Sequence, residues 1–249
     1  MNSVSDSYRA FDRQGYASGC TWLIGVDEAG RGPLAGPVFA AAVAMHRDAC
    51  DDALFSSETW GVVKDSKQLS AARRQELHTQ LMRLKGPGAH IQIGVGAASV
   101  EEIDRWNILV ATRMAMYRAL ITVQERLPGS EPKLPRTDAS LFELTGDCAG
   151  SPVEVWVDGL PLKDFPIAHR AWVKGDGRSW CIALASILAK VERDAWMLQC
   201  HRQYPWYGWD RNMGYGTSEH RDAILSRGTS PFHRRSFLKK LLNSGGSMT

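Results

Sequence analysis

An apolar run that ends in two adjacent acids and a glycine-rich loop is the feature that most constrains this 249-residue chain. Residues 22–27 are almost entirely apolar up to Asp27, which is followed by Glu28 and then by Ala-Gly-Arg-Gly-Pro. A short apolar run bounded by glycines is typical of a buried strand. A second run rich in Ala and Val, residues 38–45, follows the loop and predicts a strand paired with the first as a hairpin. The fold must therefore accommodate two carboxylates at the end of a buried strand.

Helical and strand patterns alternate along the rest of the chain. Helices are predicted over residues 70–84, with Ser70 as the N-cap, and over residues 183–198. Strands are predicted over residues 91–96, which alternate as IQIGVG, and over residues 153–158. Strands that alternate with helices predict an α/β fold with a central mixed β-sheet flanked by helices.

Another helix is predicted to begin after Ser99, because Ser99 and Glu102 have the spacing of a capping box. Its apolar residues recur at helical spacing, and we expect them to form a stripe that packs into the core. The residues of this stripe are Ile103, Trp106, Val110, Met114, Tyr117 and Ile121.

The length and the local composition predict one domain with flexible ends. We expect residues 1–20 to be a flexible N-terminal leader, residues 21–240 to be a single catalytic domain, and residues 241–249 to be a flexible tail. The C-terminal part of the domain, from about residue 199, is predicted to be a small helical appendage. Residues 127–152 are rich in Pro, Gly, Ser and Thr and exceed the usual loop length, so they are expected to be an insertion or a disordered excursion.

The composition argues against several classes of protein. The polar N-terminus has no apolar core of a signal peptide, and no apolar run reaches the ~18–20 residues of a membrane span. The five cysteines are scattered and form no C-x-x-C pair, which disfavours a disulfide framework or a zinc site. We therefore expect a cytoplasmic monomer with no membrane partner. The net charge of +3 is compatible with an anionic partner but equally with no special meaning.

Two further acids extend the first pair. Asp158 is the last residue of the predicted strand 153–158 and precedes Gly159, so it has the same place on its strand as Asp27 has. Carboxylates at strand ends lie where α/β sheets bind ligands. On the predicted helix 183–198, Asp194 lies roughly 80° from the centre of the apolar stripe, at the border of the buried face. That stripe consists of Leu184, Leu188, Val191, Ala195 and Leu198.

Convergence of Asp27, Glu28, Asp158 and Asp194 would concentrate negative charge that protons or metal ions must neutralise. No His or Cys accompanies these acids, and oxygen ligands select Mg²⁺ or Mn²⁺. Two such ions held by carboxylates are a known device for phosphodiester cleavage. Each acid alone is also typical of a turn, a cap or a solvated helix face, so spacing alone leaves the convergence open.

Several longer motifs resemble one known family, bacterial ribonuclease HII, the type 2 ribonuclease H. The resemblance covers about residues 22–238, with the motifs in the family's order. The motifs are DEAGRGPLAGPV (27–38), KDSKQLS (64–70), NILVATRMAM (107–116), VDG (157–159), KGD with SILAKVERD (174–194), GYGTSEH (214–220) and HRRSF (233–237).

The resemblance implies a ribonuclease H-like fold and a metal-dependent endonuclease. Such an enzyme cleaves the RNA strand of RNA–DNA hybrids and nicks duplex DNA on the 5′ side of a single embedded ribonucleotide, leaving 5′-phosphate and 3′-hydroxyl ends. The family's catalytic and metal-binding acids fall on Asp27, Glu28, Asp158 and Asp194, and the implied cofactor is Mn²⁺ or Mg²⁺. The implied partners are RNA–DNA hybrids and DNA duplexes that contain ribonucleotides.

The resemblance also implies substrate contacts. The loop Gly30, Arg31 and Gly32 would sense the 2′-hydroxyl, the group that distinguishes ribose from deoxyribose. Tyr215 resembles the family tyrosine that stacks on the sugar of the following deoxynucleotide, with a buried core aromatic as the alternative. Phosphate contacts are expected from Lys64, Ser66 and Lys67. Lys190 would contact a phosphate or offset the charge of the acids. A basic cluster that tracks DNA, or a plain solvated patch, is expected at His233, Arg234 and Arg235.

Two positions depart from the family pattern, and two other functions remain open at this stage. Leu160 stands where Asn is usual and Met213 where Lys is common, which concerns local contacts and not the acids.

The alternative functions are another metal-dependent nuclease of the same fold, similar to a resolvase or transposase, and a non-catalytic hybrid-binding module. Selective nicking at a lone ribonucleotide would distinguish both from the ribonuclease.

Overall fold

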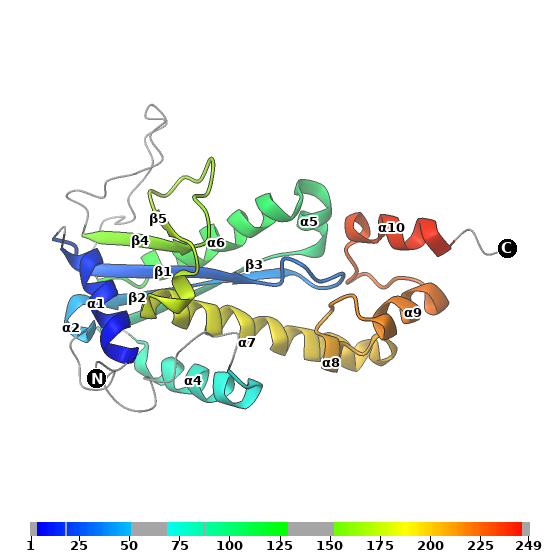
Figure 1. Ribbon diagram of the computed structural model, residues 1–249, viewed down its shortest axis with the longest axis horizontal. Helices are drawn as coiled ribbons and strands as arrows, with labels where there is room; N and C mark the ends of the chain where they lie inside the picture. Colours follow the sequence, from blue (N-terminus) through cyan, green and yellow to red (C-terminus); the bar gives the residue numbers. More distant parts are fainter. Residues whose placement is uncertain (1–3, 18, 51–68, 87, 129–151, 246–249) are drawn as a thin grey trace.

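The computed structural model describes residues 4–17, 19–50, 69–86, 88–128 and 152–245, and Figure 1 gives the labels of its elements. The strands are β1 (Trp22–Ala29), β2 (Val38–His46), β3 (Ile91–Ala98), β4 (Val153–Asp158) and β5 (Arg170–Trp172). The longer helices are α1 (Val4–Tyr16), α4 (Ala71–Leu84), α6 (Ile108–Gln124), α7 (Trp180–Gln203), α9 (Ser218–Arg227) and α10 (Arg235–Gly245). The short ones are α2 (Arg47–Cys50), α5 (Val100–Trp106), η2 (Gly175–Gly177), η3 (Pro205–Tyr207) and α8 (Trp209–Asn212).

The five strands form one mixed sheet in the order β3-β2-β1-β4-β5. β1 pairs with β2 in the antiparallel direction, as the predicted hairpin requires, and β2 pairs with β3 likewise. On its other edge β1 pairs with β4 in parallel, and β4 pairs with β5 in parallel. Strand β1 therefore lies at the centre of the sheet, and the predicted mixed α/β fold is confirmed.

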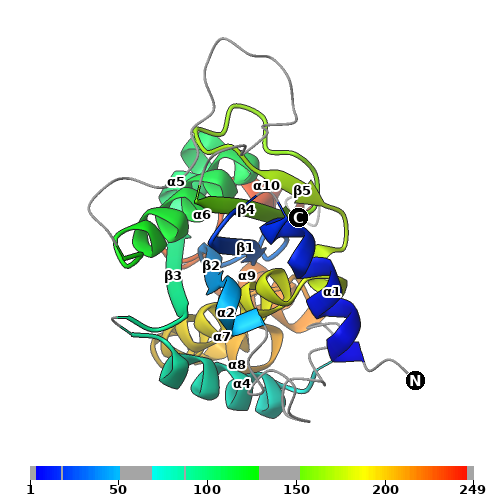
Figure 2. The ribbon, with the colours of Figure 1, turned by 90° about the vertical axis from the view of Figure 1, so that its left-hand side faces the viewer.

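Helices cover both faces of the sheet, as the end-on view in Figure 2 shows. Helix α6 packs on one face, and α7 with α4 and α1 packs on the other. Glycines allow the closest of these contacts, because a Cβ at Gly25 would lie 2.2 Å from the backbone of Cys181 in α7. A Cβ at Gly94 of β3 would lie 2.1 Å from the carbonyl oxygen of Ala119 in α6. Both helices therefore contact the sheet backbone directly.

The helix predicted after Ser99 is broken. The capping box of Ser99 and Glu102 is confirmed, but α5 ends at Asn107, whose φ of 69° is incompatible with a continuous helix. The Asn107 side chain then caps α6 by accepting hydrogen bonds from two backbone N–H groups. The expected stripe is confirmed for Ile103, which is buried, and for Met114 and Ile121, which pack against the core, but it is wrong for Trp106 and Tyr117, which are exposed. The residues that α6 buries instead are Ala111, Thr112, Ala115, Met116, Ala119, Leu120 and Val123.

The predicted ends of the chain also need correction. Residues 4–16 form helix α1 and are not a flexible leader, because Phe11 and Tyr16 pack into the core with α7. The Tyr16 hydroxyl donates a hydrogen bond to the carbonyl of Met45, and Asp12 accepts one from the Trp180 N–H. At the other end, α10 extends through Gly245 into the predicted tail.

Asp12 is expected to make the stability of the protein depend on pH. Burial raises the pKa of this carboxyl from 3.8 to about 7, against the lowering effect of its hydrogen bonds. Because the folded state holds the proton more tightly than the unfolded chain, the free energy of unfolding should fall between about pH 4 and pH 7, by on the order of 4 kcal/mol. Asp12→Asn should reduce the difference in unfolding free energy, measured with urea at about pH 5 and about pH 8, and the part that remains is expected from Asp27, whose pKa is also raised. An undiminished difference would assign the effect to other groups.

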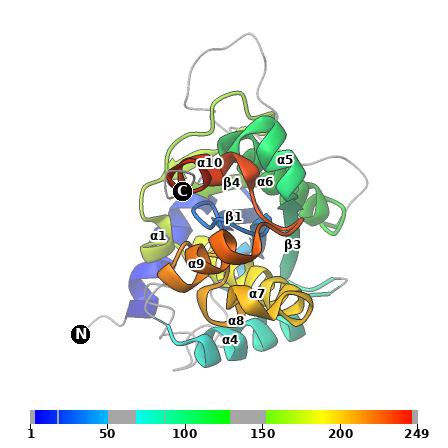
Figure 3. The same cartoon turned by 90° about the vertical axis from the view of Figure 1, so that its right-hand side faces the viewer.

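The C-terminal helical part packs at the end of the sheet where β1 finishes (Figures 1 and 3). Helices α8, α9 and α10 enclose a third apolar cluster, which includes Tyr207, Trp209 and Leu238. Met197 and Cys200 on the last turns of α7 belong to this cluster, as does Ala35 from the β1–β2 loop. The helical part is therefore built around the loop that follows the two acids. Among the described helices, none is both long and apolar enough to cross a membrane.

Candidate active site

Two of the predicted acids lie side by side on adjacent parallel strands. Val26 of β1 is paired with Val157 of β4, so Asp27 and Asp158 are the next residues along the two strands. Both side chains face α7, because Asp27 shares its face with Leu23, and Asp158 shares its face with Trp156. The residues opposite Asp27 and Glu28 on β2 are Ala41 and Ala40. The small alanine side chains leave space for the carboxylates at this end of the sheet.

The electrostatics show that three of the four acids lie close to one another. Burial raises the pKa of Asp27 well above its usual range, and the Glu28 and Asp158 carboxylates raise it further. Burial likewise raises the pKa of Glu28, the Arg31 guanidinium opposes this, and Asp158 adds to it. Ionisation of Asp27 is therefore unfavourable unless a cation compensates its charge.

Each acid has a polar partner of its own in this arrangement. Glu28 pairs with Arg31 at 3.1 Å. The Gly175 N–H donates to Asp158 Oδ1 at 2.7 Å. Ser186 on α7 forms a side-chain hydrogen bond with Asp27.

Asp194 lies two helical turns beyond Ser186 on α7 and pairs with Lys190 at 2.7 Å. Of the described acids, no three of the predicted set bring their oxygens within 4.8 Å of one another. The convergence of the fourth acid with the other three therefore stays a prediction.

The donor set fits a hard divalent cation. All four candidate ligands are carboxylates, and oxygen ligands of this kind are typical of Mg²⁺ and Mn²⁺ sites. The raised pKa of Asp27 is the observation that tests the fit, since it reflects burial first and then the repulsion from the Glu28 and Asp158 carboxylates. A dication would reverse that effect and keep Asp27 ionised.

Helix α7 differs from the prediction in its length and in its buried face. It runs from Trp180 to Gln203 and not only over residues 183–198. Ala195 and Leu198 of the predicted stripe are exposed, whereas Arg193 and Met197 are buried. The second half of the helix packs against the C-terminal helices as well as the sheet, which rotates its buried face.

Two buried arginines hold the loop that follows the acids. Arg234 is fully buried, and its guanidinium donates to the carbonyls of Gly30, Arg31, Gly36 and Pro37.

Arg193 on α7 is 1 % exposed and donates to the carbonyls of Pro37, Ala35 and Met213. The two guanidiniums therefore donate to the carbonyls of five residues of the loop between β1 and β2.

The predicted basic cluster at residues 233–235 is wrong for two of its members. Arg234 and His233 are buried inside the C-terminal part, and only Arg235 is exposed. Sequence reasoning missed Arg193 and Arg234 as loop-holding residues, and the charge of Arg234 suggested a DNA contact or a solvated patch. The glycines of the loop were the available sequence signal, because they allow a large side chain to approach the backbone closely. In the structure Gly30 has a φ of +95°, and a Cβ there would lie 2.0 Å from Arg193 Nε.

Tyr215 lies next to the glycine loop and is exposed. Its ring is the nearest neighbour of Gly32, at 3.8 Å from the position of a Cβ there, and 46 % of the residue is accessible. The Arg193 guanidinium lies 6.0 Å from the ring centre. The alternative of a buried core aromatic is therefore wrong.

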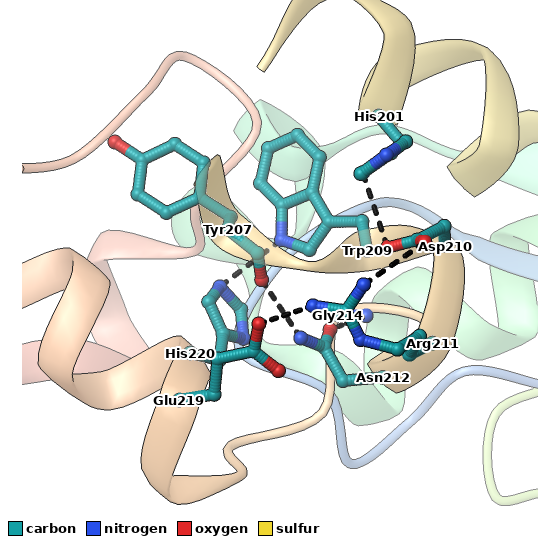
Figure 4. A network of polar contacts seen from close by, with 9 residues as sticks. All are labelled: His201, Tyr207, Trp209, Asp210, Arg211, Asn212, Gly214, Glu219 and His220. Carbon is teal, nitrogen blue, oxygen red and sulfur yellow. Dashed lines mark hydrogen bonds and ion pairs between the residues drawn. The ribbon is translucent and has the colours of Figure 1, made fainter. Parts of the chain in front are cut away.

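A network of polar contacts fixes the turn that carries Tyr215 (Figure 4). The Asn212 side chain donates to the Tyr207 carbonyl and accepts from the Gly214 N–H. Trp209 Nε1 donates to His220 Nε2 at 3.0 Å, and an indole N–H can only donate.

The hydrogen of the neutral His220 ring therefore sits on Nδ1 and is donated to the Tyr215 carbonyl at 2.9 Å. The Ser230 N–H donates to His233 Nδ1 at 2.9 Å, and His233 Nε2 lies 3.1 Å from His220 Nε2.

The remaining predicted positions have varied outcomes. Lys64, Ser66 and Lys67, and most of the excursion 127–152, lie outside the described residues. Leu160 is exposed. Met213 adopts the left-handed conformation with a φ of 48°, and its carbonyl is one of the acceptors of Arg193.

Comparison with known proteins gives consistent matches. The family model described as Ribonuclease HII matches residues 24–129 and 161–240. A protein named Ribonuclease HII from Rhodospirillum rubrum is 46 % identical over 215 residues, which cover 86 % of this chain and 83 % of that one. A similarly named protein from Thermosynechococcus vestitus is 42 % identical over 95 % of this chain and 91 % of its own.

Among solved structures, the ribonuclease H2 from Pyrococcus horikoshii OT3 has a TM-score of 0.61 at 21 % identity, covering 91 % of this chain and 99 % of that chain. The structure of Bst-RNase HIII in complex with Mn²⁺ also has a TM-score of 0.61, at 19 % identity, covering 93 % and 72 %. These two likenesses concern the fold, which is ribonuclease H-like.

Proposed function

Because this chain belongs to the ribonuclease HII family and is a type 2 ribonuclease H, we propose that it nicks duplex DNA on the 5′ side of single embedded ribonucleotides. It would also cleave the RNA strand of RNA–DNA hybrids and leave 5′-phosphate and 3′-hydroxyl ends. The observation that carries the proposal is the pair Asp27 and Asp158 on adjacent strands, beside a loop that a buried arginine holds.

We assign a divalent cation to the carboxylates of Asp27, Glu28, Asp158 and Asp194. When bound, such a cation activates water and stabilises the leaving oxygen in phosphodiester hydrolysis. The structure of Bst-RNase HIII in complex with Mn²⁺ supports the choice of Mn²⁺ here, and the carboxylate ligands suit Mg²⁺ as well. The family match leaves out residues 130–160, so the role of Asp158 rests on its place beside Asp27 and on the resemblance of its VDG motif.

The residues around the acids would recognise the substrate. Backbone groups of Gly30 and Gly32 can approach a sugar closely, because glycine has no side chain in the way. The 2′-hydroxyl is the group that this loop would sense. Lys190 would contact a phosphate or balance the charge of Asp194, with which it is paired at 2.7 Å. Lys64, Ser66 and Lys67 remain proposed phosphate contacts.

The direct test is a nicking assay on duplex DNA with one ribonucleotide, in Mg²⁺ and in Mn²⁺ separately. We expect one product, cut on the 5′ side of the ribonucleotide, and no cleavage of the all-DNA duplex. Cleavage that ignores the ribonucleotide would favour another nuclease of the same fold. Binding of the hybrid without cleavage in either metal would favour a binding module.

Tyr215→Ala is expected to weaken recognition of the nucleotide beside the ribonucleotide. Stacking of an aromatic ring on a base is worth about 1–3 kcal/mol, and if the contact of the Tyr215 ring with the sugar is of similar size, kcat/KM on the single-ribonucleotide duplex should fall roughly 5- to 150-fold. Tyr215→Phe keeps the ring and should retain most of the activity. Equal losses in the two variants would show that the hydroxyl, and not stacking, is the important group.

A further inference from the structure

Three side chains with metal-binding atoms meet at the end of the sheet opposite the acids. His46 is the last residue of β2, Asp48 follows two residues later in α2, and His90 directly precedes β3. One ligand atom from each residue lies within 4.8 Å of the other two. Within the described residues, no other group of three or more His, Cys, Asp or Glu side chains is this compact.

The backbone holds this group in place. The His46 N–H donates to the His90 carbonyl at 2.8 Å, which continues the β2–β3 pairing by one step. Trp22 is the partner of His46 on β1, and the edge of its ring packs against the imidazole at a centroid distance of 5.0 Å. On the other side the His90 ring stacks on His46, also at 5.0 Å. The His46 ring is thus fixed between two neighbours on adjacent strands.

Asp48 makes polar contacts with the same His46 ring. Its N–H donates to His46 Nδ1, and its Oδ2 lies 3.3 Å from that nitrogen. The side chain of the intervening Arg47 is directed to the Tyr16 carbonyl. Two imidazoles and one carboxylate are therefore presented together, with Asp48 and His90 on the exposed side.

We propose that His46, Asp48 and His90 form a second metal site, which binds Zn²⁺ or a chemically similar transition-metal dication. Imidazole with carboxylate suits Zn²⁺, whereas carboxylates alone suit Mg²⁺ and Mn²⁺. A tetrahedral ion with ligand bonds of about 2.0–2.2 Å needs ligand atoms about 3.4 Å apart, which rotation of the two exposed side chains can provide. Three protein ligands leave the fourth position to water or a further ligand.

This site is separate from the acids. Trp22 and Asp27 are five residues apart on β1, which corresponds to about 17 Å along a strand. A metal bound at each end of the sheet can therefore be counted independently. The difference in ligand chemistry means that excess Mg²⁺ should not displace Zn²⁺ from the histidine site.

The test is Zn²⁺ titration by calorimetry and equilibrium dialysis. The full chain with both Asp27→Asn and Asp158→Asn is used, so that the acidic site does not contribute. We expect one saturable Zn²⁺ per chain in the presence of excess Mg²⁺. Adding His90→Gln should weaken binding at least ~10-fold, since even loss of an outer-shell partner typically weakens a metal by 10–100-fold. His201→Gln, which alters a histidine outside the group, is the matched control.

A second measurement distinguishes the loss of a metal ligand from misfolding of a variant. Zn²⁺ should shift the imidazole ¹⁵N resonances of His46 and His90, and leave those of His201 unchanged. Unchanged affinity in the His90→Gln variant, no saturable Zn²⁺ in the parent, or equal shifts of all histidines would overturn the proposal. None of these results bears on the nicking assay, so the two proposals fail separately.

Discussion

Replacing Asp27 by Asn is expected to reduce the cleavage rate at least ~10³-fold, since loss of a single oxyanion-hole hydrogen-bond donor already costs 10²–10³-fold. The same variant is expected to be more stable than the parent protein in metal-free buffer. Burial and two neighbouring carboxylates raise the pKa of Asp27, so its ionised form opposes folding. The amide is neutral and still offers an oxygen to the Glu28 N–H, which donates to Asp27 Oδ1 at 2.7 Å.

The measurement pairs single-turnover cleavage with thermal unfolding. In a chain of this size each kcal/mol gained raises Tm by about 2–4 °C. Saturating Mn²⁺ should stabilise the parent, by about 2.7 kcal/mol at one hundred times its Kd, and should stabilise the variant much less. Asp222→Asn, on the exposed face of α9, should change neither quantity. Full activity of the Asp27 variant would refute the site, and a lower Tm without metal would refute the electrostatic account.

Arg234→Ala is expected to destabilise the protein strongly, whereas Arg235→Ala next to it should not. The Arg234 guanidinium donates to the carbonyls of four residues of the loop after β1, and no part of the residue is exposed. Removing it leaves those acceptors buried without donors, so we expect a loss of roughly 3–5 kcal/mol in the free energy of unfolding. Arg235 is exposed, and surface substitutions of this kind change stability by about 0.5 kcal/mol or less.

Urea unfolding of the two variants measures this difference directly. DNA binding at two salt concentrations adds a second comparison, because a residue that contacts phosphate changes the salt dependence of binding. A stable Arg234→Ala protein with weakened, less salt-dependent binding would restore Arg234 to the DNA-contacting role that its sequence suggested. Equal and small stability losses in both variants would show that the loop does not depend on Arg234.

The order of the elements was predictable because it rests on local patterns. Residues 22–27 and 38–45 are apolar runs separated by glycines, and they form the hairpin of β1 and β2. Ser70 and Ser99 are found at the helix starts where capping chemistry places them. Each of these features depends on residues within a few positions along the chain, which a sequence displays directly.

Features that depend on distant partners were misjudged. The charge of Arg234 suggested a solvated patch, yet its buried guanidinium donates to carbonyls of residues 30–37, about two hundred positions earlier in the chain. The polar residues near the N-terminus suggested a flexible leader, yet Phe11 packs against Trp156 of β4, and Asp12 accepts a hydrogen bond from the Trp180 N–H of α7. The apolar spacing after Ser99 predicted one helix, but Asn107 ends it by capping the next.

For the candidate site, the sequence by itself determined the chemistry: adjacent acids at the end of a buried strand, more acids at corresponding places, and a glycine loop. Only the tertiary structure decided that Asp27 and Asp158 are neighbours, because the register of β1 with β4 joins segments that are far apart in the chain. Only it revealed His46 and His90 as cross-strand partners. Side-chain type and local pattern are properties of the chain, whereas proximity between distant residues arises from packing and strand pairing.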